Sequence, residues 1–318
     1  MKTWKTFLGA FALAFATAAT AQYPNHAIKL IVPFSAGGST DIIARLTAEQ
    51  MRKELGQAVV VENVGGAGGA LGTLQGKNAQ PDGYTLLIAT VSTMIVIPAT
   101  QNQQYSLDDF VPITNIASMP NIMTVNEKFP AKNLTEFIEV LKKNPGKYTY
   151  ATSGVGSINH MLGESFQAYS GTKIVHIPYK GSGPAMQDVM AGTVDILFDQ
   201  FPSSKTYIDG GKLKPIGAIS PQKIPGYTNV MTMEEAGLKG FTDEAWYGLL
   251  MPKGTPADIV AKVTDAMKKS LANPDLRAKL ENVGARPVGN SSQEFAQQIR
   301  TEQERMKKLV KERNIKLD

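Results

Sequence analysis

Short apolar runs alternate with amphipathic stretches along the first third of the chain. Residues 28–32 (IKLIV), 59–61 (VVV) and 84–88 (YTLLI) are apolar or β-branched runs, a pattern that favours strands. Between the first two runs, residues 39–55 place apolar side chains at four- and eight-residue steps, which favours a helix. Strands that alternate with helices predict βαβ units on a parallel sheet. Ser39 or Thr40 is expected to cap this helix at its start, and Gly56 is expected to end it.

The same order begins again after residue 133. Residues 134–143 predict a helix, residues 148–151 a strand, and residues 158–169 a second helix with an apolar side. Two extended apolar segments contain prolines near residues 119–121 and 219–221, which we interpret as two hinge crossings. The sequence therefore predicts an α/β fold of two lobes, each a mostly parallel sheet flanked by helices. The expected division is 22–120 plus 221–318 for lobe 1 and 121–220 for lobe 2.

Two glycine-bearing loops each end a predicted strand and start a predicted helix. The first loop runs from Pro33 to Asp41 (PFSAGGSTD) and the second from Ser153 to Ser157 (SGVGS). The first turn of a helix has unpaired N–H groups and the positive end of the helix dipole, so it suits an anion. Open α/β sheets also bind their ligands at the carboxyl ends of strands. Two such loops in separate halves predict a carboxylate site between the lobes.

The candidate ligand-binding residues come from both loops and from the segment after the third strand. They are Phe34, Ser35, Ala36, Gly37, Gly38, Ser39 and Asp41, then Ser92 and Thr93, then Ser153, Gly154, Val155, Gly156 and Ser157. Free backbone amides and serine hydroxyls supply the donors in this set. The apolar side chains of Phe34, Met94 and Ile95 favour room for an aromatic or extended acid.

Four further residues are candidates, His160, Lys180, Gly181 and Asp199, and three of them have two interpretations each. His160, early in the second helix, either supports its loop or contacts the ligand. Lys180, next to Gly181 in a glycine turn, is either a cation that faces the cleft or an exposed lysine. Asp199 follows an apolar strand, and it either binds a donor group of the ligand or caps the serines that come after it.

The first 21 residues have the pattern of a secretion signal. Lys2 and Lys5 precede the apolar run 7–19, and Ala19-Thr20-Ala21 offers a small-x-small cleavage pattern. A membrane anchor is the alternative, but the apolar run is shorter than the roughly 20 residues that a spanning helix needs. The sequence thus predicts a cleaved signal peptide, residues 1–21, and export to the periplasm.

Composition and motifs argue against several classes of function. The 318 residues carry no cysteine, so disulfides and thiolate metal sites are excluded, and the formal net charge of +5 forms no basic stripe for nucleic acid. The chain lacks the G-x-S-x-G, P-loop and H-E-x-x-H motifs, and its three histidines have no metal-ligand spacing. We therefore predict no catalytic residues, no metal and no cofactor.

Several motifs, in this order, resemble the substrate-binding proteins of the tripartite tricarboxylate transporter system, the Bug-type receptors. The similarity covers essentially the whole mature chain. It rests on Pro33-Phe34-x-x-Gly37-Gly38-x-x-Asp41, Pro81-Asp82-Gly83-Tyr84, Ser153-Gly154-x-Gly156-Ser157-x-x-His160, Pro178-Tyr179-Lys180-Gly181 and Trp246-x-Gly248-x-x-x-Pro252. The chain departs from the family at Val64-Gly65, where a basic residue is usual.

This resemblance implies a two-lobed, hinge-closing periplasmic binding protein of the type II-like class. It implies that the two glycine loops hold one carboxylate, partly through ordered waters, and that Asp41 braces its loop. The far end of the ligand would be read by residues 90–95, Lys180 and Asp199. The implied partners are a small mono-, di- or aromatic carboxylate and membrane permease subunits, with the receptor itself a monomer and not an enzyme. An exported hydrolase that acts on a small carboxylate-bearing ester or amide is the alternative.

Overall fold

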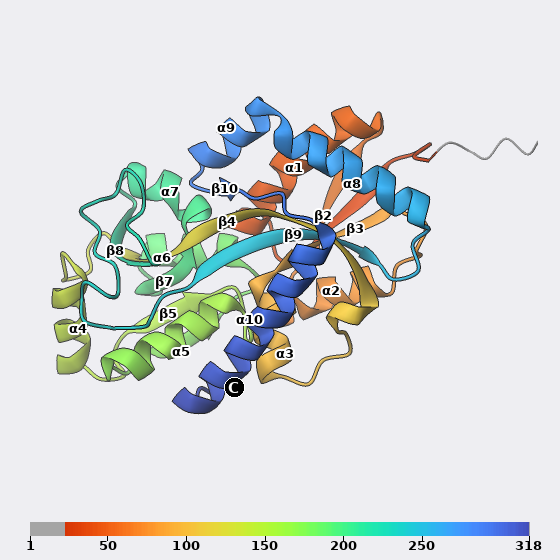
Figure 1. Cartoon of the computed structure of the whole chain (residues 1–318). Helices are drawn as coiled ribbons and strands as arrows, with labels where there is room; N and C mark the ends of the chain where they lie inside the picture. The colour runs from red at the N-terminus through yellow and green to blue at the C-terminus, as the bar shows by residue number, and fades with distance from the viewer. Residues whose placement is uncertain (1–22, 318) are drawn as a thin grey trace, which may run out of the picture.

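Lobe 1 is built on three parallel strands. A computed structural model describes residues 23–317, so the predicted signal peptide lies outside the described residues (Figure 1). The parallel strands are β2 (Val59–Asn63), β1 (Ile28–Val32) and β3 (Thr85–Thr90), in this order. β9 (Glu244–Pro252) then pairs antiparallel with β3, and the first part of β4 (Phe110–Asn126) pairs antiparallel with β9. β10 (Arg286–Pro287) adds a short antiparallel pair to β4.

Helices cover this sheet on both faces. The longer ones are α1 (Ser39–Leu55), α2 (Ala70–Lys77), α8 (Ala257–Ala272), α9 (Pro274–Asn282) and α10 (Ser292–Arg313). Short helical turns are η1 (Ala67–Gly69), η2 (Ser92–Val96), α3 (Ile97–Thr100) and η3 (Leu107–Asp109). In Figure 1, α10 runs from lobe 1 down to the C-terminus near α5 of lobe 2.

Lobe 2 repeats the parallel arrangement. β7 (Ile196–Gln200), β5 (Thr149–Thr152) and β6 (Val175–Pro178) are parallel, and the second part of β4 pairs antiparallel with β7 and with β8 (Leu213–Ile219). The helices are α4 (Leu134–Lys143), α5 (Ile158–Ser170), α6 (Ser182–Ala191) and α7 (Phe201–Asp209). The helix predicted for residues 134–143 is confirmed, since α4 begins and ends at the same residues.

The sheets are mixed, so the prediction of mostly parallel sheets needs correction. β4 and β9 run side by side between the lobes in Figure 1, and they pair antiparallel from Phe110↔Pro252 to Pro120↔Glu244. One strand leaves lobe 1 and the other returns to it, which makes them run in opposite directions. Only the outer strands of each lobe belong to the parallel βαβ units that the sequence pattern predicts.

β4 changes its pairing partners within residues 119–121, the segment in which we expect the first crossing between lobes. Pro120 of β4 still pairs in the lobe 1 sheet, and the next residue, Asn121, pairs with Gln200 and Ile219 in lobe 2. For the return, the N–H of Ala218 donates to Met231 and the N–H of Met233 donates to Ala218, so the chain beyond residue 221 still packs on lobe 2. This geometry favours a second crossing near Glu244 over one at residues 219–221.

The start of α1 differs from the expected cap. Gly38 is the N-cap residue and makes no side-chain cap bond, while Ser39 and Thr40 lie inside the helix. At the other end Gly56 adopts the left-handed conformation and closes the helix as C-cap. Without a side-chain cap, the first N–H groups of α1 stay available for other acceptors.

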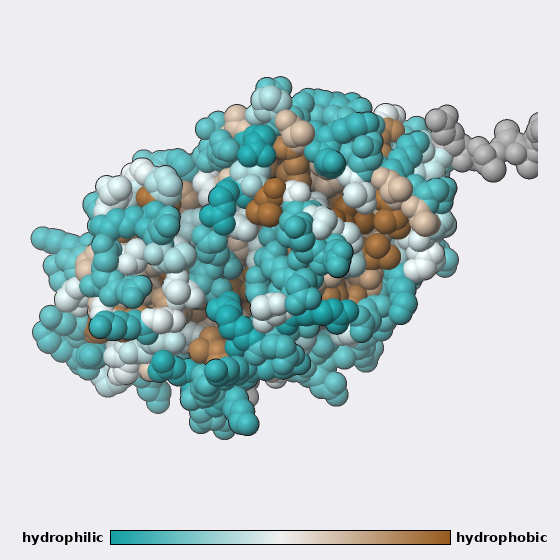
Figure 2. All heavy atoms as spheres, in the orientation of Figure 1, coloured by the Kyte–Doolittle hydropathy of each residue, from teal (hydrophilic) through white to brown (hydrophobic). Residues whose placement is uncertain are grey.

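The surface is mostly polar and the apolar side chains are inside. Figure 2 shows a largely hydrophilic face with scattered hydrophobic patches over lobe 1. Of the residues described, 23–317, no helix has the length and apolar character to cross a membrane. The same residues contain no group of three or more histidine, aspartate or glutamate side chains that could hold a metal ion.

Candidate functional site

The first glycine loop touches lobe 2 directly. The backbone N–H of Ser35 and its hydroxyl both donate to the carbonyl oxygen of Lys180, each at 3.1 Å. Gly37 lies against Gly183, at the start of α6. The Lys180 side chain is exposed, so the backbone carbonyl of this residue, and not its ammonium group, makes the contact between the lobes.

Asp41 braces this loop from inside. Its carboxylate accepts hydrogen bonds from the Gly37 N–H at 3.1 Å, from Asn63 Nδ2 at 3.0 Å and from Arg45 Nε at 3.0 Å. Burial by itself would raise the pKa of Asp41, but the bonds from Arg45, Gly37 and Asn63 outweigh it and hold the pKa below its usual range. The Gly37 amide is thus already paired and is not one of the free donors of this loop.

Unpaired amides remain at the start of α1. Within residues 23–317 the backbone N–H groups of Ser39 and Thr40 have no hydrogen-bond partner. Both residues line the cavity between the lobes. The positive end of the α1 dipole therefore faces this cavity with at least two donors.

The Ser39 hydroxyl joins the first loop to a buried carboxylate in lobe 2. Its Oγ lies 2.7 Å from Ser203 Oγ and accepts the Ser203 N–H at 2.9 Å. Ser203 Oγ donates in turn to Asp199 at 2.5 Å, and Ser182 Oγ donates to Asp199 at 2.6 Å. Asp199 is 0% exposed, and burial raises the pKa of its carboxyl. Of its two interpretations, the geometry favours bonding to the neighbouring serines.

Sequence reasoning missed Gln200 and its partners. Gln200 Nε2 donates to Asn159 at 2.9 Å and to Asn121 at 3.1 Å, and the Tyr247 hydroxyl donates to Gln200 Oε1 at 3.2 Å. Each of these side chains is buried. The available signal was a polar residue after the apolar run Ile196–Phe198: Gln200 directly follows Asp199 at the end of the fully buried strand β7.

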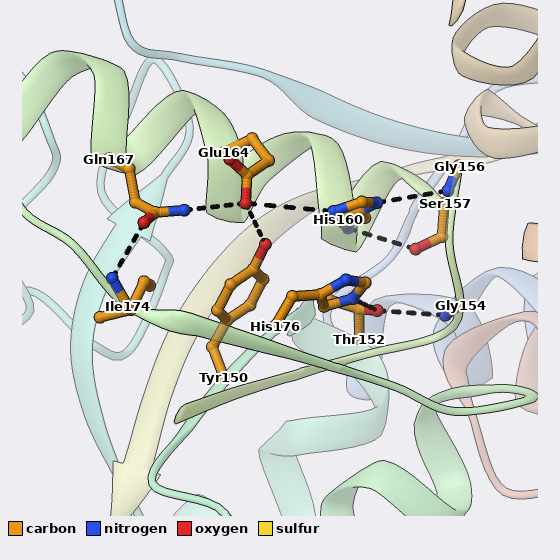
Figure 3. A network of polar contacts seen from close by, with 10 residues as sticks. All are labelled: Tyr150, Thr152, Gly154, Gly156, Ser157, His160, Glu164, Gln167, Ile174 and His176. Atoms are coloured by element: carbon orange, nitrogen blue, oxygen red, sulfur yellow. Dashed lines mark hydrogen bonds and ion pairs between the residues drawn. The ribbon is translucent and has the colours of Figure 1, made fainter. Parts of the chain in front are cut away.

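Side chains also hold the second glycine loop (Figure 3). The Gly154 N–H donates to Thr152 Oγ1 at 3.2 Å, and the Gly156 N–H donates to His160 Nδ1 at 3.4 Å. Ser157 caps α5, since its Oγ accepts the His160 N–H at 3.2 Å. The amides of Gly154 and Gly156 are therefore paired, contrary to the expectation of free donors, and His160 supports its loop.

His160 is one half of a stacked histidine pair. Its ring lies 3.8 Å from that of His176 with an interplanar angle of 14°. Burial, and then the neighbouring His176, lowers the pKa of His160 to about 3, and burial lowers the pKa of His176 to about 4. Both rings are thus neutral at pH 7, which lets His160 Nδ1 accept a hydrogen bond. His176 Nε2 lies 2.7 Å from Thr152 Oγ1 and completes the support of the loop.

Ser92 and Thr93, the predicted ligand residues after β3, make different contacts. Ser92 Oγ accepts the N–H of Ile158, the first residue of α5, at 2.9 Å across the lobes. Thr93 is fully buried and its hydroxyl bonds with Thr90. Met94 and Ile95 belong to the hydrophobic core and do not line the cavity, so they give no support for a spacious apolar pocket.

The cavity between the lobes is where α1, α5 and α6 begin. Its lining includes Phe34, Ser39, Thr40 and Ser92 from lobe 1 and Ser153, Ile158 and Ser182 from lobe 2. Its volume of about 10 Å³ is close to what one water molecule needs. A solute can therefore enter only when the lobes move apart.

Comparison with known proteins gives a family match over most of the chain. The model described as "Tripartite tricarboxylate transporter family receptor" matches residues 43–315. A protein from the TAR-I ttuE-ttuC′ intergenic region of Agrobacterium vitis is 34% identical, over 96% of this chain and 89% of its own. Protein BugT of Bordetella pertussis is 33% identical, over 93% of this chain and 91% of its own.

Solved structures agree with this fold. One described as a periplasmic transporter has a TM-score of 0.90 and 49% identity, covering 93% of this chain and 100% of its own. Rpa4515 of R. palustris with adipate has a TM-score of 0.88 and 30% identity, covering 92% and 99%. MatC of Rhodopseudomonas palustris with bound malate has a TM-score of 0.86 and 32% identity, covering 91% and 100%.

Proposed function

Because the chain belongs to the tripartite tricarboxylate transporter receptor family, we propose that it binds a small organic carboxylate between its lobes in the periplasm. The chain is a solute receptor, and the family and its structural neighbours are solute-binding proteins, so the hydrolase alternative has no support. Relatives that carry adipate and malate support a carboxylate as ligand. We further propose that the monomeric receptor delivers its ligand to membrane permease subunits after export.

One observation carries the choice of an anion as ligand. The N–H groups of Ser39 and Thr40 are unpaired at the start of α1 and line the interlobe cavity. A hydrogen bond to a charged group contributes roughly 1.5–3 kcal/mol net. Because micromolar affinity corresponds to about 8 kcal/mol, a few such donors supply much of the binding free energy. We propose that the ligand carboxylate lies at this helix start when the lobes are apart.

The second glycine loop has a different part in this proposal. Its Gly154 and Gly156 amides are paired with Thr152 and His160, so the loop is held in a fixed shape. Ser153 lines the cavity and is the candidate ligand contact of this loop. The exposed Lys180 side chain stays a candidate for the far end of the ligand, and the buried Gly181 beside it stays a candidate ligand contact.

The test removes a single amide from the start of α1. Ser39 is the first residue of the helix, a position where proline is well tolerated and lacks the N–H. Ser39→Pro and Ser39→Ala both lose the hydroxyl, but only the proline variant loses the amide. We expect the proline variant to bind the acid roughly 10- to 150-fold more weakly than the alanine variant.

A thermal-shift panel of malate, adipate, benzoate and other organic acids identifies the ligand, and calorimetric titration then measures both variants. If no acid stabilises the wild type, the carboxylate receptor fails as a proposal. Equal affinity of the two variants would remove the Ser39 amide from the site and leave the receptor proposal standing.

A further inference from the structure

The lobes meet through backbone at the mouth of the cleft. A Cβ atom added at Gly183, the second residue of α6, would lie 2.2 Å from the carbonyl oxygen of Ala36 in lobe 1. In lobe 1, a Cβ atom added at Gly65 would lie 2.5 Å from the carbonyl oxygen of Lys180 in lobe 2. Real Cβ atoms essentially never come within 3.0 Å of such an atom. Neither position can carry a side chain while the lobes are in this arrangement.

A third glycine, Gly68 of lobe 1, makes a similar close backbone contact with lobe 2. A Cβ atom at Gly68 would lie 2.4 Å from the carbonyl oxygen of Val155 in the second glycine loop. We call the three positions Gly65, Gly68 and Gly183 the glycine seam. Ser35 bonds to the Lys180 carbonyl beside the seam, so close backbone approach and hydrogen bonding between lobes occur at the same place.

The reason that Gly183 must be glycine is different from the reasons at Gly65 and Gly68. Gly68 has a φ of 61°, which its own turn requires, and a Cβ at Gly65 would also meet the Ser35 nitrogen of its own lobe at 2.9 Å. Gly183 is absent from the positive-φ glycines and lies in a helix, where alanine is favourable. The three nearest atoms to its added Cβ belong to Ala36 and Gly37 of lobe 1. Only contact between the lobes excludes a methyl group there.

We propose that Gly183 is a closure-determining residue of the receptor, an inference that rests on the proposed function. A methyl group at this position fits lobe 2 alone but strikes the Ala36 carbonyl before the lobes can close. The obstruction also keeps Ser35 from reaching the Lys180 carbonyl. The variant is then a folded receptor whose lobes stay apart.

The experiment measures the separation of the lobes directly. The chain has no cysteine, so Lys53→Cys on α1 and Gln187→Cys on α6, both exposed, give two unique spin-label positions on separate lobes. Distance distributions are recorded by pulsed electron paramagnetic resonance for the wild-type background and for Gly183→Ala, without additive, with malate and with adipate. Circular dichroism and thermal unfolding confirm that each protein is folded.

Gly210→Ala is the matched control. Gly210 is an exposed residue at the end of α7 in the same lobe, has a negative φ of −82°, and its added Cβ would meet only the Thr206 carbonyl oxygen, at 3.2 Å. It tests the same glycine-to-alanine change away from the seam. We expect it to follow the wild type in every distance distribution.

The expected result is a short-separation population in the wild type and in Gly210→Ala that is missing in Gly183→Ala. A Gly183→Ala receptor that reaches the same short separation would overturn this inference and leave the proposed function intact. A wild type that shows no short separation without additive, with malate or with adipate would also overturn this inference. The proposed function fails separately, if no organic acid of the thermal-shift panel stabilises the wild type.

Discussion

Ser92 of lobe 1 caps the first turn of a helix in lobe 2: its Oγ accepts the N–H of Ile158 at 2.9 Å. Ser92 and Ile158 belong to different lobes, so the bond exists only while the lobes are in contact, and both residues are buried. Ser35 and Ser39 also bond to the opposite lobe, through Lys180 and Ser203. Three serines predicted as ligand contacts thus stabilise the closed arrangement.

Ser92→Ala should therefore weaken closure. The substitution leaves the buried Ile158 N–H without an acceptor in the closed state, at a cost of about 1–3 kcal/mol. We expect the population of the closed lobes relative to the open lobes to fall roughly 5- to 150-fold, as measured by pulsed electron paramagnetic resonance between labels at Lys53→Cys and Gln187→Cys. Ser270→Ala is the control, because the Ser270 hydroxyl is buried but bonds only within α8. Equal closed populations in the two variants would contradict a role of Ser92 in closure.

Asp41→Asn should loosen the first glycine loop. An amide cannot accept from Gly37, Asn63 and Arg45 as the carboxylate does, so we expect a loss of about 1–3 kcal/mol in the free energy of unfolding. The folded-state pKa of Asp41 is lowered, so its stabilisation is present above the ordinary pKa near 4 and is lost as the pH falls through the folded value. The difference between wild type and variant should shrink from pH 7 towards pH 3 in denaturant titrations. Asp275→Asn, an exposed change on α9, is the control.

The histidine pair should make the fold sensitive to acid. The folded-state pKa values of about 3 for His160 and about 4 for His176 lie below the unfolded value near 6.5. The unfolded chain therefore binds more protons between these values, and stability falls as the pH drops from 6.5 towards 4. For the buried His160 the loss at pH 5 is about 2 kcal/mol.

His160→Asn tests this pH dependence. The asparagine Oδ1 can still accept the Gly156 N–H, but the side chain does not titrate. We expect a shallower loss of unfolding free energy between pH 6.5 and pH 4 than in the wild type, with little difference between the two slopes above pH 7. Parallel curves across the whole range would show that His160 does not carry the acid sensitivity.

Asp199 should have the opposite pH dependence. Burial raises its folded-state pKa above the unfolded value near 4, so the folded state binds the extra proton, and stability is lost as the pH rises from 4 to the folded value. Asp199→Asn removes this titration while keeping the shape of the side chain. The stability of the variant relative to the wild type should increase with pH above 4, as measured by urea unfolding. A constant difference between the two proteins would contradict a raised pKa.

The sequence by itself predicted the features that depend on neighbouring residues. The helix Leu134–Lys143, the glycine C-cap at Gly56 and the two glycine loops at strand ends all follow from local periodicity and turn chemistry. The family resemblance was also present in the sequence, because its motifs are short and ordered along the chain. The candidate ligand residues beyond the described contacts stay predictions.

Only the tertiary structure decided which donors are free. Asp41 and His160 pair the amides of Gly37 and Gly156, whereas the amide of Ser39 stays open, and nothing in the local sequence separates these cases. The mixed sheet and the position of the second crossing also depend on β4 and β9 lying side by side, from segments more than 100 residues apart. Hydrogen bonds between distant segments form only after the chain folds, so local patterns determined the elements and the meeting of the lobes determined the site.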